Sequence, residues 1–454
     1  MTDNTSIAEP SQSMFSSRDL TKLIIPLIIE QLFAVLIGMM DIIMVAVDGE
    51  KAISSISLVD SINILIINLF SALATGGAVI VSQYLGMRER EKACNAAKQL
   101  QYISLFISAA VAAVSLLFGN SILSLIFGKI DPEIMEKCRI YFFISALSYP
   151  FLAIYNSGAA LFRSMGNSKI SMYISLMMNT LNVIGNYILI YIFRFGVFGA
   201  ALASLVARMV GCIYINVMLL NKKNAVFIEH PFRFRPNFFL IRKIFKIGIP
   251  TGLENCMFQF GKLFMSHLVS TFGQSSIAAN AVSNSIISFS NVPGQAIGLA
   301  IITIVGQCIG AGKKDQAYQY SRRLLRLTYL IMIGINLTVI LLSSYITASF
   351  NLEAGSAALT KEIIIIFSIV SSLIWPLAFT IPNSLRAAGD VNFSMIVSIA
   401  SMWIFRVLLG YILCLGFHFG LHGVWIAMYV DWVCRLIFYV WRFYGKTWLN
   451  RRVL

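Results

Sequence analysis

Charged side chains are scarce in this chain of 454 residues, since Asp, Glu, Lys and Arg together make up only 12% of it. A soluble domain is about 25% charged. Hydrophobic residues reach 58%, which excludes an intrinsically disordered chain and argues against a soluble enzyme. A helix that crosses a bilayer needs roughly 20 apolar residues. The composition therefore indicates a membrane protein with many spans, and the length allows about twelve of them with their loops.

Motifs of several enzyme and pump classes are also missing. The seven cysteines lie scattered without CxxC or Cys/His spacing, which argues against a disulfide framework or a zinc site. Neither GxxxxGK[ST] nor HExxH occurs, so an ATP-driven pump and a zinc hydrolase are not expected. No cofactor is therefore predicted. The polar N-terminal segment 1–20 does not resemble a signal peptide, so we expect the first span to direct insertion.

Apolar runs separated by polar breaks predict twelve membrane-spanning helices. We expect the first six near residues 22–46, 53–84, 98–118, 138–161, 170–193 and 197–220. We expect the second six near residues 245–271, 277–308, 325–348, 360–384, 393–415 and 423–441.

Basic residues outnumber acidic ones by 35 to 20, for a net charge of +15. Most of them lie at the two ends of the chain and in every second connection, with a large group in the loop 221–243. Cytoplasmic loops of membrane proteins are enriched in Lys and Arg. The pattern predicts that both termini are cytoplasmic. Because membrane orientation explains the excess charge, no nucleic-acid partner is expected.

The two halves of the chain repeat each other. Polar and conformationally special residues match at a constant offset of 224 in the numbering: Lys22 with Lys246, Pro26 with Pro250, Glu30 with Glu254, Gln83 with Gln307 and Gly86 with Gly310. The offset is 223 for Arg163 with Arg386 and Ser171 with Ser394, and it is 224 again for Tyr187 with Tyr411. Parallel repeats are a transporter architecture, with the substrate site between them near the bilayer midplane.

The predicted fold is an all-α membrane protein with about twelve transmembrane helices in two parallel six-helix repeats. We expect a cytoplasmic N-terminal tail (1–20), an N-lobe with spans 1–6 (21–220), a cytoplasmic inter-lobe loop (221–243), a C-lobe with spans 7–12 (244–442) and a cytoplasmic C-terminal tail (443–454).

Five acidic residues lie inside predicted spans, where ionisable groups are costly and are candidates for function: Glu30, Asp41, Asp60, Glu254 and Asp431. Asp41 shares a span with Glu30 but with no basic residue, so it is a candidate cation site, the alternative being a structural pair. Glu30 and Glu254 occupy equivalent repeat positions and could serve either coupling or packing. Asp60 is placed near the outer end of its span, where the start of a helix suits an acid. Asp431 precedes Arg435 by four residues, which favours a structural ion pair.

Asn182 and Asn186 are four residues apart and therefore share one face of a helix. Side-chain carbonyls near a carboxylate could form an oxygen shell for a hard cation. Hydrogen bonding between helices is the equally weighted alternative.

Several ordered motifs resemble those of the multidrug and toxic compound extrusion (MATE) transporters of bacteria. They include IPLIIEQLFAVLIGMMDIIMV (25–45), SQYLGMREREKA (82–93), LFRSMGNSK (161–169), LNVIGNYILI (181–190), IGIPTGLENCMFQFGK (247–262), VGQCIGAGKKDQA (305–317) and LRAAGD (385–390). The resemblance implies two six-helix lobes that form a V around a central cleft. It also implies export of organic cations, driven by inward flow of Na⁺ or H⁺, across the bacterial plasma (inner) membrane.

The same resemblance places the residues of the site. The cation-coupling site would fall on Asp41, Asn182, Asn186 and Ser204, with Glu254 as a further coupling acid. Asp41 and Asn182 are the expected ligands if the ion is Na⁺. Substrate-cavity or gating roles are expected for Pro26, Glu30, Asn156 and Asp60, with Pro26 allowing its helix to bend.

We therefore expect a cation-coupled (Na⁺ or H⁺) antiporter that exports amphipathic, mostly cationic organic compounds by alternating access. The expected partners are small organic cations and membrane lipids, and the expected state is a monomer. One alternative is a flippase for lipid-linked oligosaccharides or lipids, which would use a basic cleft that Arg208, Lys262 and Arg406 could supply. A second alternative is a membrane-embedded transferase.

Overall fold

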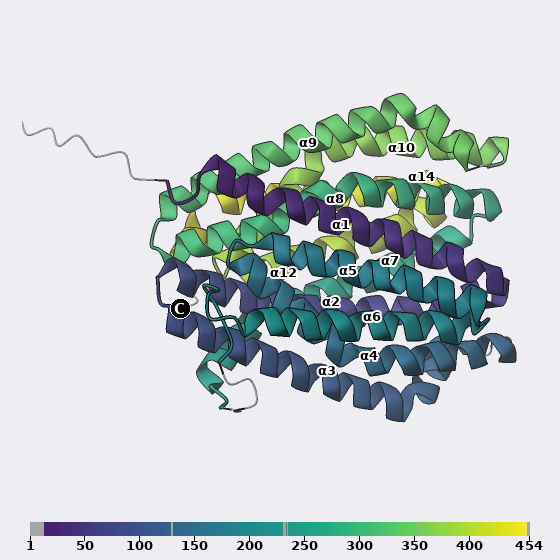
Figure 1. The fold of residues 1–454 in the computed structure, drawn as a ribbon. Coiled ribbons are helices and arrows are strands. Elements are labelled where there is room, and N and C mark those ends of the chain that lie inside the picture. Colours follow the sequence, from purple (N-terminus) through teal and green to yellow (C-terminus); the bar gives the residue numbers. More distant parts are fainter. Residues whose placement is uncertain (1–12, 129, 230–232, 234, 351, 452–454) are drawn as a thin grey trace, which may run out of the picture.

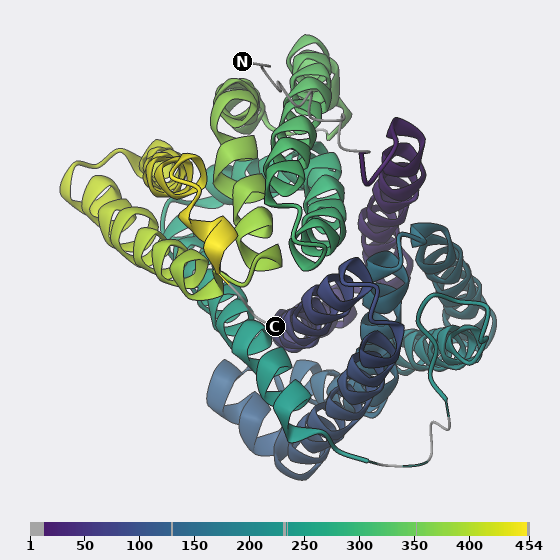
Figure 2. The ribbon, with the colours of Figure 1, turned by 90° about the vertical axis from the view of Figure 1, so that its left-hand side faces the viewer.

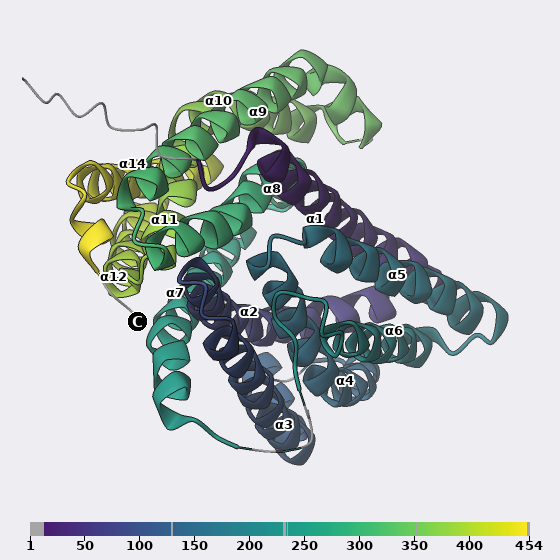
Figure 3. The ribbon, with the colours of Figure 1, turned by 60° about the vertical axis from the view of Figure 1, so that its left-hand side comes forward.

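The computed structural model describes residues 13–128, 130–229, 233, 235–350 and 352–451, apart from the side chains of Met39 and Ile42. Within these ranges the regular structure is helical and contains no strand (Figure 1). Figures 2 and 3 show the first and the last six spans as two groups of helices.

The N-terminal group holds one long helix for each of the first six predicted spans. These are α1 (Ser17–Val45), α2 (Glu50–Gly86), α3 (Arg90–Phe127), α4 (Pro132–Ser164), α5 (Ser168–Asn186) and α6 (Gly196–Leu219). A π-helical segment, Tyr187–Ile192, extends α5, and a short 3₁₀ turn, Ala46–Asp48, follows α1.

The C-terminal group covers the other six predicted spans, two of which are interrupted by π-helical segments. It begins with α7 (Phe238–Ser270), α8 (Gln274–Gly310) and α9 (Lys314–Ser349). The tenth span joins α10 (Ala354–Trp375) to α11 (Ile381–Ala387) through the π-helical segment Pro376–Thr380. The eleventh comprises α12 (Val391–Ser401), the π-helical segment Met402–Leu408, α13 (Leu409–Tyr411) and the π-helical segment Ile412–Gly416. The chain ends with α14 (Gly420–Tyr444) and a 3₁₀ turn, Thr447–Asn450.

Eleven helical stretches in the described part of the chain are long and apolar enough to cross a membrane. The seventh predicted span, on α7, is not among them, although α7 has 33 residues. Its sequence includes Glu254 and Lys262, which lower its hydropathy. The α7 helix packs along α2, and Glu254 and Lys262 both line the central cavity.

The structure confirms the internal repeat down to the ends of the helices. The first and last residues of α8, Gln274 and Gly310, stand at the repeat offset from those of α2, Glu50 and Gly86. Left-handed backbone positions repeat as well: Gly49 has φ 93° and Gly273 has φ 85°, and Arg194 and His418 have φ 56° and 57°. The two halves therefore share their turns as well as their helices.

The change of offset from 223 to 224 means that the second half holds one more residue between Ser394 and Tyr411 than the first half holds in the equivalent stretch. The π-helical segment Met402–Leu408 lies within this stretch and directly follows α12 in the eleventh span. A π-turn holds one residue more than an α-turn, and such turns are frequent at functional sites. The extra residue is thus absorbed in a π-turn, and Arg406 lies on it.

The two lobes meet through α1 and α2 of the first and α7 and α8 of the second (Figure 3). At one end the contact is reciprocal: Gln83 donates to the Ala387 carbonyl at 2.9 Å, and Gln307 donates to the Ser164 carbonyl at 2.7 Å. Gly86 makes the crossing of α2 and α8 close, because a Cβ there would lie 2.0 Å from the Gln307 carbonyl oxygen. We call Gln83, Gly86, Gln307 and Gly310 the inter-lobe contact.

The two ends of the described chain lie at the same end of the molecule. The Phe15 amide donates to the Tyr320 hydroxyl at 2.8 Å, and Lys314 Nζ donates to Asn450 Oδ1 at 2.9 Å, so both ends touch the start of α9. An even number of spans requires this arrangement.

Large apolar side chains also remain on the outer faces of the helices, where Leu117 is 78% and Leu125 87% exposed. A lipid-facing surface accounts for them.

Candidate functional site

The structure brings together the four residues predicted for the cation site. Asn186 Nδ2 donates to Asp41 Oδ1 at 2.7 Å, which joins α5 to α1. Asn182 Nδ2 donates to Ser204 Oγ at 2.9 Å, which joins α5 to α6. Asn186 is 1% exposed, and its Oδ1 has no hydrogen-bond partner among the described residues. We call Asp41, Asn182, Asn186 and Ser204 the N-lobe site.

A second acidic residue borders the N-lobe site. Asp60 accepts a hydrogen bond from Asn63 Nδ2 at 3.0 Å and lies within electrostatic range of Asp41 and Arg208. Its predicted position at the start of a helix is wrong, because α2 begins at Glu50 and Asp60 lies nearly three turns further on. Asp60 therefore belongs to the interior of the N-lobe, where the dipole of the helix terminus does not act.

Arg208 is a residue that the sequence prediction left out of the site. Its Nη1 donates to Ser148 Oγ at 2.6 Å, so it stands between α6 and α4. Its occurrence as a cation inside a predicted span is the signal that could have included it.

A separate cavity of about 680 Å³ lies between the two lobes. Of the predicted cavity residues, Glu30 and Asn156 line it, and Glu254 does as well. Asp60 and the residues of the N-lobe site are not among its lining residues, and neither is Pro26, which is buried within α1. In this conformation the N-lobe site and the central cavity are thus distinct.

Glu30 and Glu254 form equivalent ion pairs in the two repeats. Arg163 Nη1 lies 3.2 Å from Glu30 Oε1, and Arg386 Nη2 lies 2.7 Å from Glu254 Oε1. Glu30 is 6% exposed and Glu254 is 7% exposed. A buried carboxylate needs a compensating charge, so the repeat positions are explained by pairing. Glu254 can serve coupling only if this pair opens, and the structure gives it no contact with the N-lobe site.

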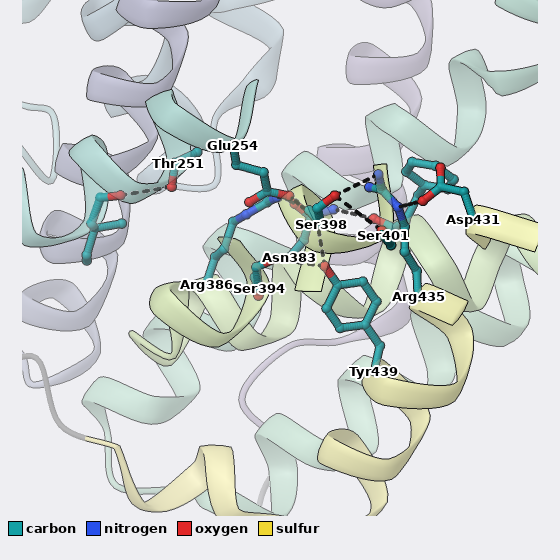
Figure 4. A network of polar contacts seen from close by, with 12 residues as sticks. Thr251, Glu254, Asn383, Arg386, Ser394, Ser398, Ser401, Asp431, Arg435 and Tyr439 are labelled. Carbon is teal, nitrogen blue, oxygen red and sulfur yellow. Dashed lines mark hydrogen bonds and ion pairs between the residues drawn. The ribbon is translucent and has the colours of Figure 1, made fainter. Parts of the chain in front are cut away.

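The pair at Glu254 belongs to a larger network in the C-lobe (Figure 4). Ser398 Oγ donates to Glu254 Oε1 at 2.6 Å and contacts the Tyr439 hydroxyl at 2.7 Å. Arg435 Nη2 donates to the Ser398 carbonyl, and its Nε lies 2.8 Å from Asp431 Oδ1. The predicted structural pair of Asp431 and Arg435 is therefore confirmed, and the network joins α7, α11, α12 and α14.

Three cations gather around one aromatic ring at the C-lobe side of the central cavity. Lys262 Nζ lies 5.1 Å from the centroid of the Phe258 ring, and the guanidinium carbons of Arg406 and Arg435 lie 5.5 and 5.3 Å from it. All four residues line the cavity. The sequence shows each cation inside a span, but it does not show that they meet, because they come from α7, the π-turn and α14.

Comparison with known proteins identifies the architecture. The MatE family model matches residues 26–188 and 250–412, two copies whose limits differ by the same repeat offset. The chain belongs to the MatE family. The protein is accordingly a membrane transporter and not an enzyme, which removes the transferase alternative.

Relatives of this MatE protein span its whole length. It is 27% identical over 455 residues to the uncharacterized transporter YisQ of Bacillus subtilis, covering 99% of this chain and 98% of the relative. It is 24% identical over 449 residues to the probable multidrug resistance protein NorM of Thermotoga maritima, covering 96% and 94%. A solved outward-facing structure of a multidrug resistance MATE transporter of the MOP superfamily matches with a TM-score of 0.88 at 21% identity, covering 94% and 96%.

Proposed function

We propose that this MatE transporter is a cation-coupled antiporter that exports amphipathic organic compounds by alternating access. The observation that carries the proposal is the N-lobe site, in which Asp41 contacts a neutral amide and no described cation forms an ion pair with it. A carboxylate inside a membrane protein that lacks a paired cation can bind one from solution. The name of the relative NorM supports drug-like substrates.

The arrangement around Asp41 suits a small hard cation. Such ions take oxygen ligands, and the unpartnered Oδ1 of Asn186 stands next to the Asp41 carboxylate. Asp41, Asn182 and Asn186 would hold Na⁺, whereas a proton would bind Asp41 alone. No group of three or more Asp, Glu, His or Cys side chains suited to a metal occurs in the described ranges, so a site for a multivalent ion is not proposed.

The proposed exchange runs between two arrangements of the lobes. In this proposal the inter-lobe contact closes the central cavity at one end of the molecule. Export requires the two ends to open alternately, so this contact must break in one of the two arrangements. A cation at Asp41 and a positively charged substrate near Asp60 and Asp41 would compete for the same negative charge. Mutual exclusion of the two then couples their movements.

We further propose that the protein works as a monomer in the bacterial inner membrane, with both termini in the cytoplasm. The location of both described chain ends at one end of the molecule supports this orientation, together with the basic residues concentrated in the connections at that side.

Asp41→Asn is expected to reduce ion-driven efflux at least about tenfold, because the substitution removes the negative charge that attracts Na⁺ and the carboxylate that takes up a proton. The measurement is efflux of ethidium from proteoliposomes under separately imposed sodium and pH gradients. The gradient that drives wild-type efflux identifies the coupling ion.

Asp315→Asn is the matched control, because Asp315 is an exposed carboxylate in the first turn of α9. It should leave efflux unchanged. Full gradient-driven efflux by Asp41→Asn would contradict the proposed coupling site.

A second candidate is a flippase for a lipid with an anionic headgroup, which the basic residues Lys262 and Arg406 in the central cavity favour. The lipid headgroup would have to bind at these residues, and phosphatidylglycerol would then compete with other anions for them.

A further inference from the structure

We propose that the C-lobe wall of the central cavity binds the anionic group of an amphipathic compound, a carboxylate, sulfonate or phosphate, between Lys262 and Arg406. This site lies outside the proposed coupling site and adds a substrate class of opposite charge to the organic cations expected above.

The first argument is a local imbalance of charge. Lys262, Arg406 and Arg435 surround Phe258. The described carboxylate paired with them is Asp431, which lies 2.8 Å from Arg435 and 3.9 Å from Arg406. Two of the three positive charges thus lack a full counter-charge among the described residues. Like charges this close repel each other in a cavity of low dielectric, and an anionic ligand would relieve the repulsion.

The other cations of the cavity do not share this excess. Arg163 and Arg386 each have a carboxylate of their own, Glu30 and Glu254. The free positive charge of the cavity is therefore confined to the wall around Phe258.

The second argument is an excess of hydrogen-bond donors at the same wall. Trp425 and Trp432 line the cavity, are 5% and 3% exposed, and their indole N–H groups have no partner among the described residues. Lys262 Nζ makes no hydrogen bond or ion pair with a described side chain, and Arg406 donates only to the Met402 sulfur at 3.8 Å. Indole and ammonium groups donate and do not accept. A ligand that satisfies them must bring acceptor oxygens.

The surroundings suit the apolar part of such a ligand. Phe379 stacks on Trp375 at 5.2 Å between ring centroids and meets Trp432 edge-on at 5.5 Å. All three rings line the cavity. Aromatic walls next to clustered donors recognise molecules with a flat apolar body and one charged end.

Comparison of the two repeats shows that the positive charge around Phe258 is a feature of the C-lobe alone. At the repeat offset, Asp41 corresponds to Met265 and Asn186 to Gly410, so the C-lobe has no counterpart of the N-lobe site. The C-lobe instead carries Arg406 on the π-turn that holds the additional residue. The two lobes therefore present opposite charges, an acidic site in the first and a basic wall in the second.

Two probes with the same fluorophore test the proposal. Dansylglycine carries a carboxylate and dansylcadaverine carries an ammonium group. Binding to the purified full-length protein in detergent is followed by energy transfer from tryptophan to dansyl. We expect dansylglycine to bind, and we expect loss of one cation of this wall to weaken its binding roughly tenfold, the range of a charge-assisted hydrogen bond, without weakening the binding of dansylcadaverine. Absence of saturable dansylglycine binding, or equal weakening of both probes, would overturn the proposal.

Variants locate the site. Lys262→Gln and Arg406→Gln should each weaken dansylglycine binding roughly tenfold, whereas Lys262→Arg should retain most of the affinity. Lys361→Gln, which removes an exposed lysine on α10, is the control and should bind like the wild type. Unchanged affinity in both glutamine variants would refute the assignment. If either glutamine variant is not monodisperse, the affinity of Lys262→Met for the two probes tests the assignment instead. Lys262→Met should bind dansylglycine more weakly than the wild type does and dansylcadaverine equally well.

Two further arms separate related questions. Equilibrium binding needs no ion gradient, so an anion site would stand even if efflux by Asp41→Asn refuted the coupling proposal. Competition in lipid nanodiscs distinguishes the source of the anion. Displacement of dansylglycine by phosphatidylglycerol but not by phosphatidylcholine assigns the site to a lipid headgroup, and retention in both lipids assigns it to a soluble anion.

Discussion

Gly86→Ala is expected to destabilise the inter-lobe contact by about 1–3 kcal/mol, the range for overpacking a close contact. The new Cβ would lie 2.0 Å from the Gln307 carbonyl oxygen and 2.9 Å from the Ala311 amide nitrogen. Both are backbone atoms, so no side-chain rotation relieves the clash and α2 must move away from α8. The substitution should therefore shift the transporter away from the conformation in which this end is closed.

Ser82→Cys reports on the opening. Ser82 is fully buried on α2 and faces α8, because a Cβ at Gly306 would lie 2.9 Å from the Ser82 Cβ. Reaction of Ser82→Cys with a membrane-permeant maleimide, quantified by mass spectrometry of the labelled peptide, should be slow by itself and several-fold faster when Gly86→Ala is added. Gly310→Ala should act alike, since its Cβ would lie 2.0 Å from the Gln83 carbonyl oxygen. Gly334→Ala on α9 is the control, because its Cβ would meet open space. Unaltered labelling at position 82 in both contact variants would show that this end is not held closed by the crossing.

The fold was predictable because its signals are local or periodic. Apolar runs predicted the spans, and the repeat of Pro26 and Glu30 at Pro250 and Glu254 predicted two equivalent halves. Apolar runs between polar breaks also predicted the span on α7, although α7 is not among the stretches that are apolar enough to be marked as spans in the described part of the chain. The π-helical segment Met402–Leu408 was not predicted as such, but the shift in repeat offset already located the additional residue that it absorbs.

The partners of charged residues were predictable only at short range. Asp431 and Arg435 are one helical turn apart, and their pair follows from spacing. Glu30 and Arg163 are 133 residues apart, so the sequence left open whether Glu30 serves coupling or packing. The N-lobe site was placed by family resemblance, because Asp41 meets Asn186 across 145 residues. The basic wall around Phe258 depends on three separate elements and could not be read from any one of them.

Asp431→Asn is expected to cost about 3–5 kcal/mol of stability, the range for removing one partner of a buried ion pair. Asp431 is fully buried and Arg435 is 3% exposed, so the isosteric change leaves Arg435 and Arg406 without their carboxylate. Thermal unfolding of the purified protein measures the loss. In a double-mutant cycle, Asp431→Leu combined with Arg435→Met should recover much of it, because an apolar pair carries no desolvation cost. A double variant as unstable as the sum of the single ones would contradict the pairing.

Asp431→Asn also tests whether the Asp431–Arg435 pair is purely structural or, in addition, lowers the excess positive charge of the central cavity. Asp431→Asn raises the excess positive charge beside Lys262, so dansylglycine should bind it more tightly than it binds the wild type. A ligand that binds only the folded state raises stability in proportion to the logarithm of its concentration over Kd. Dansylglycine should therefore raise the unfolding temperature of Asp431→Asn by more than that of the wild type, and dansylcadaverine should not. An equal rise in both proteins would mean that Asp431 stabilises α14 without controlling what the cavity accepts.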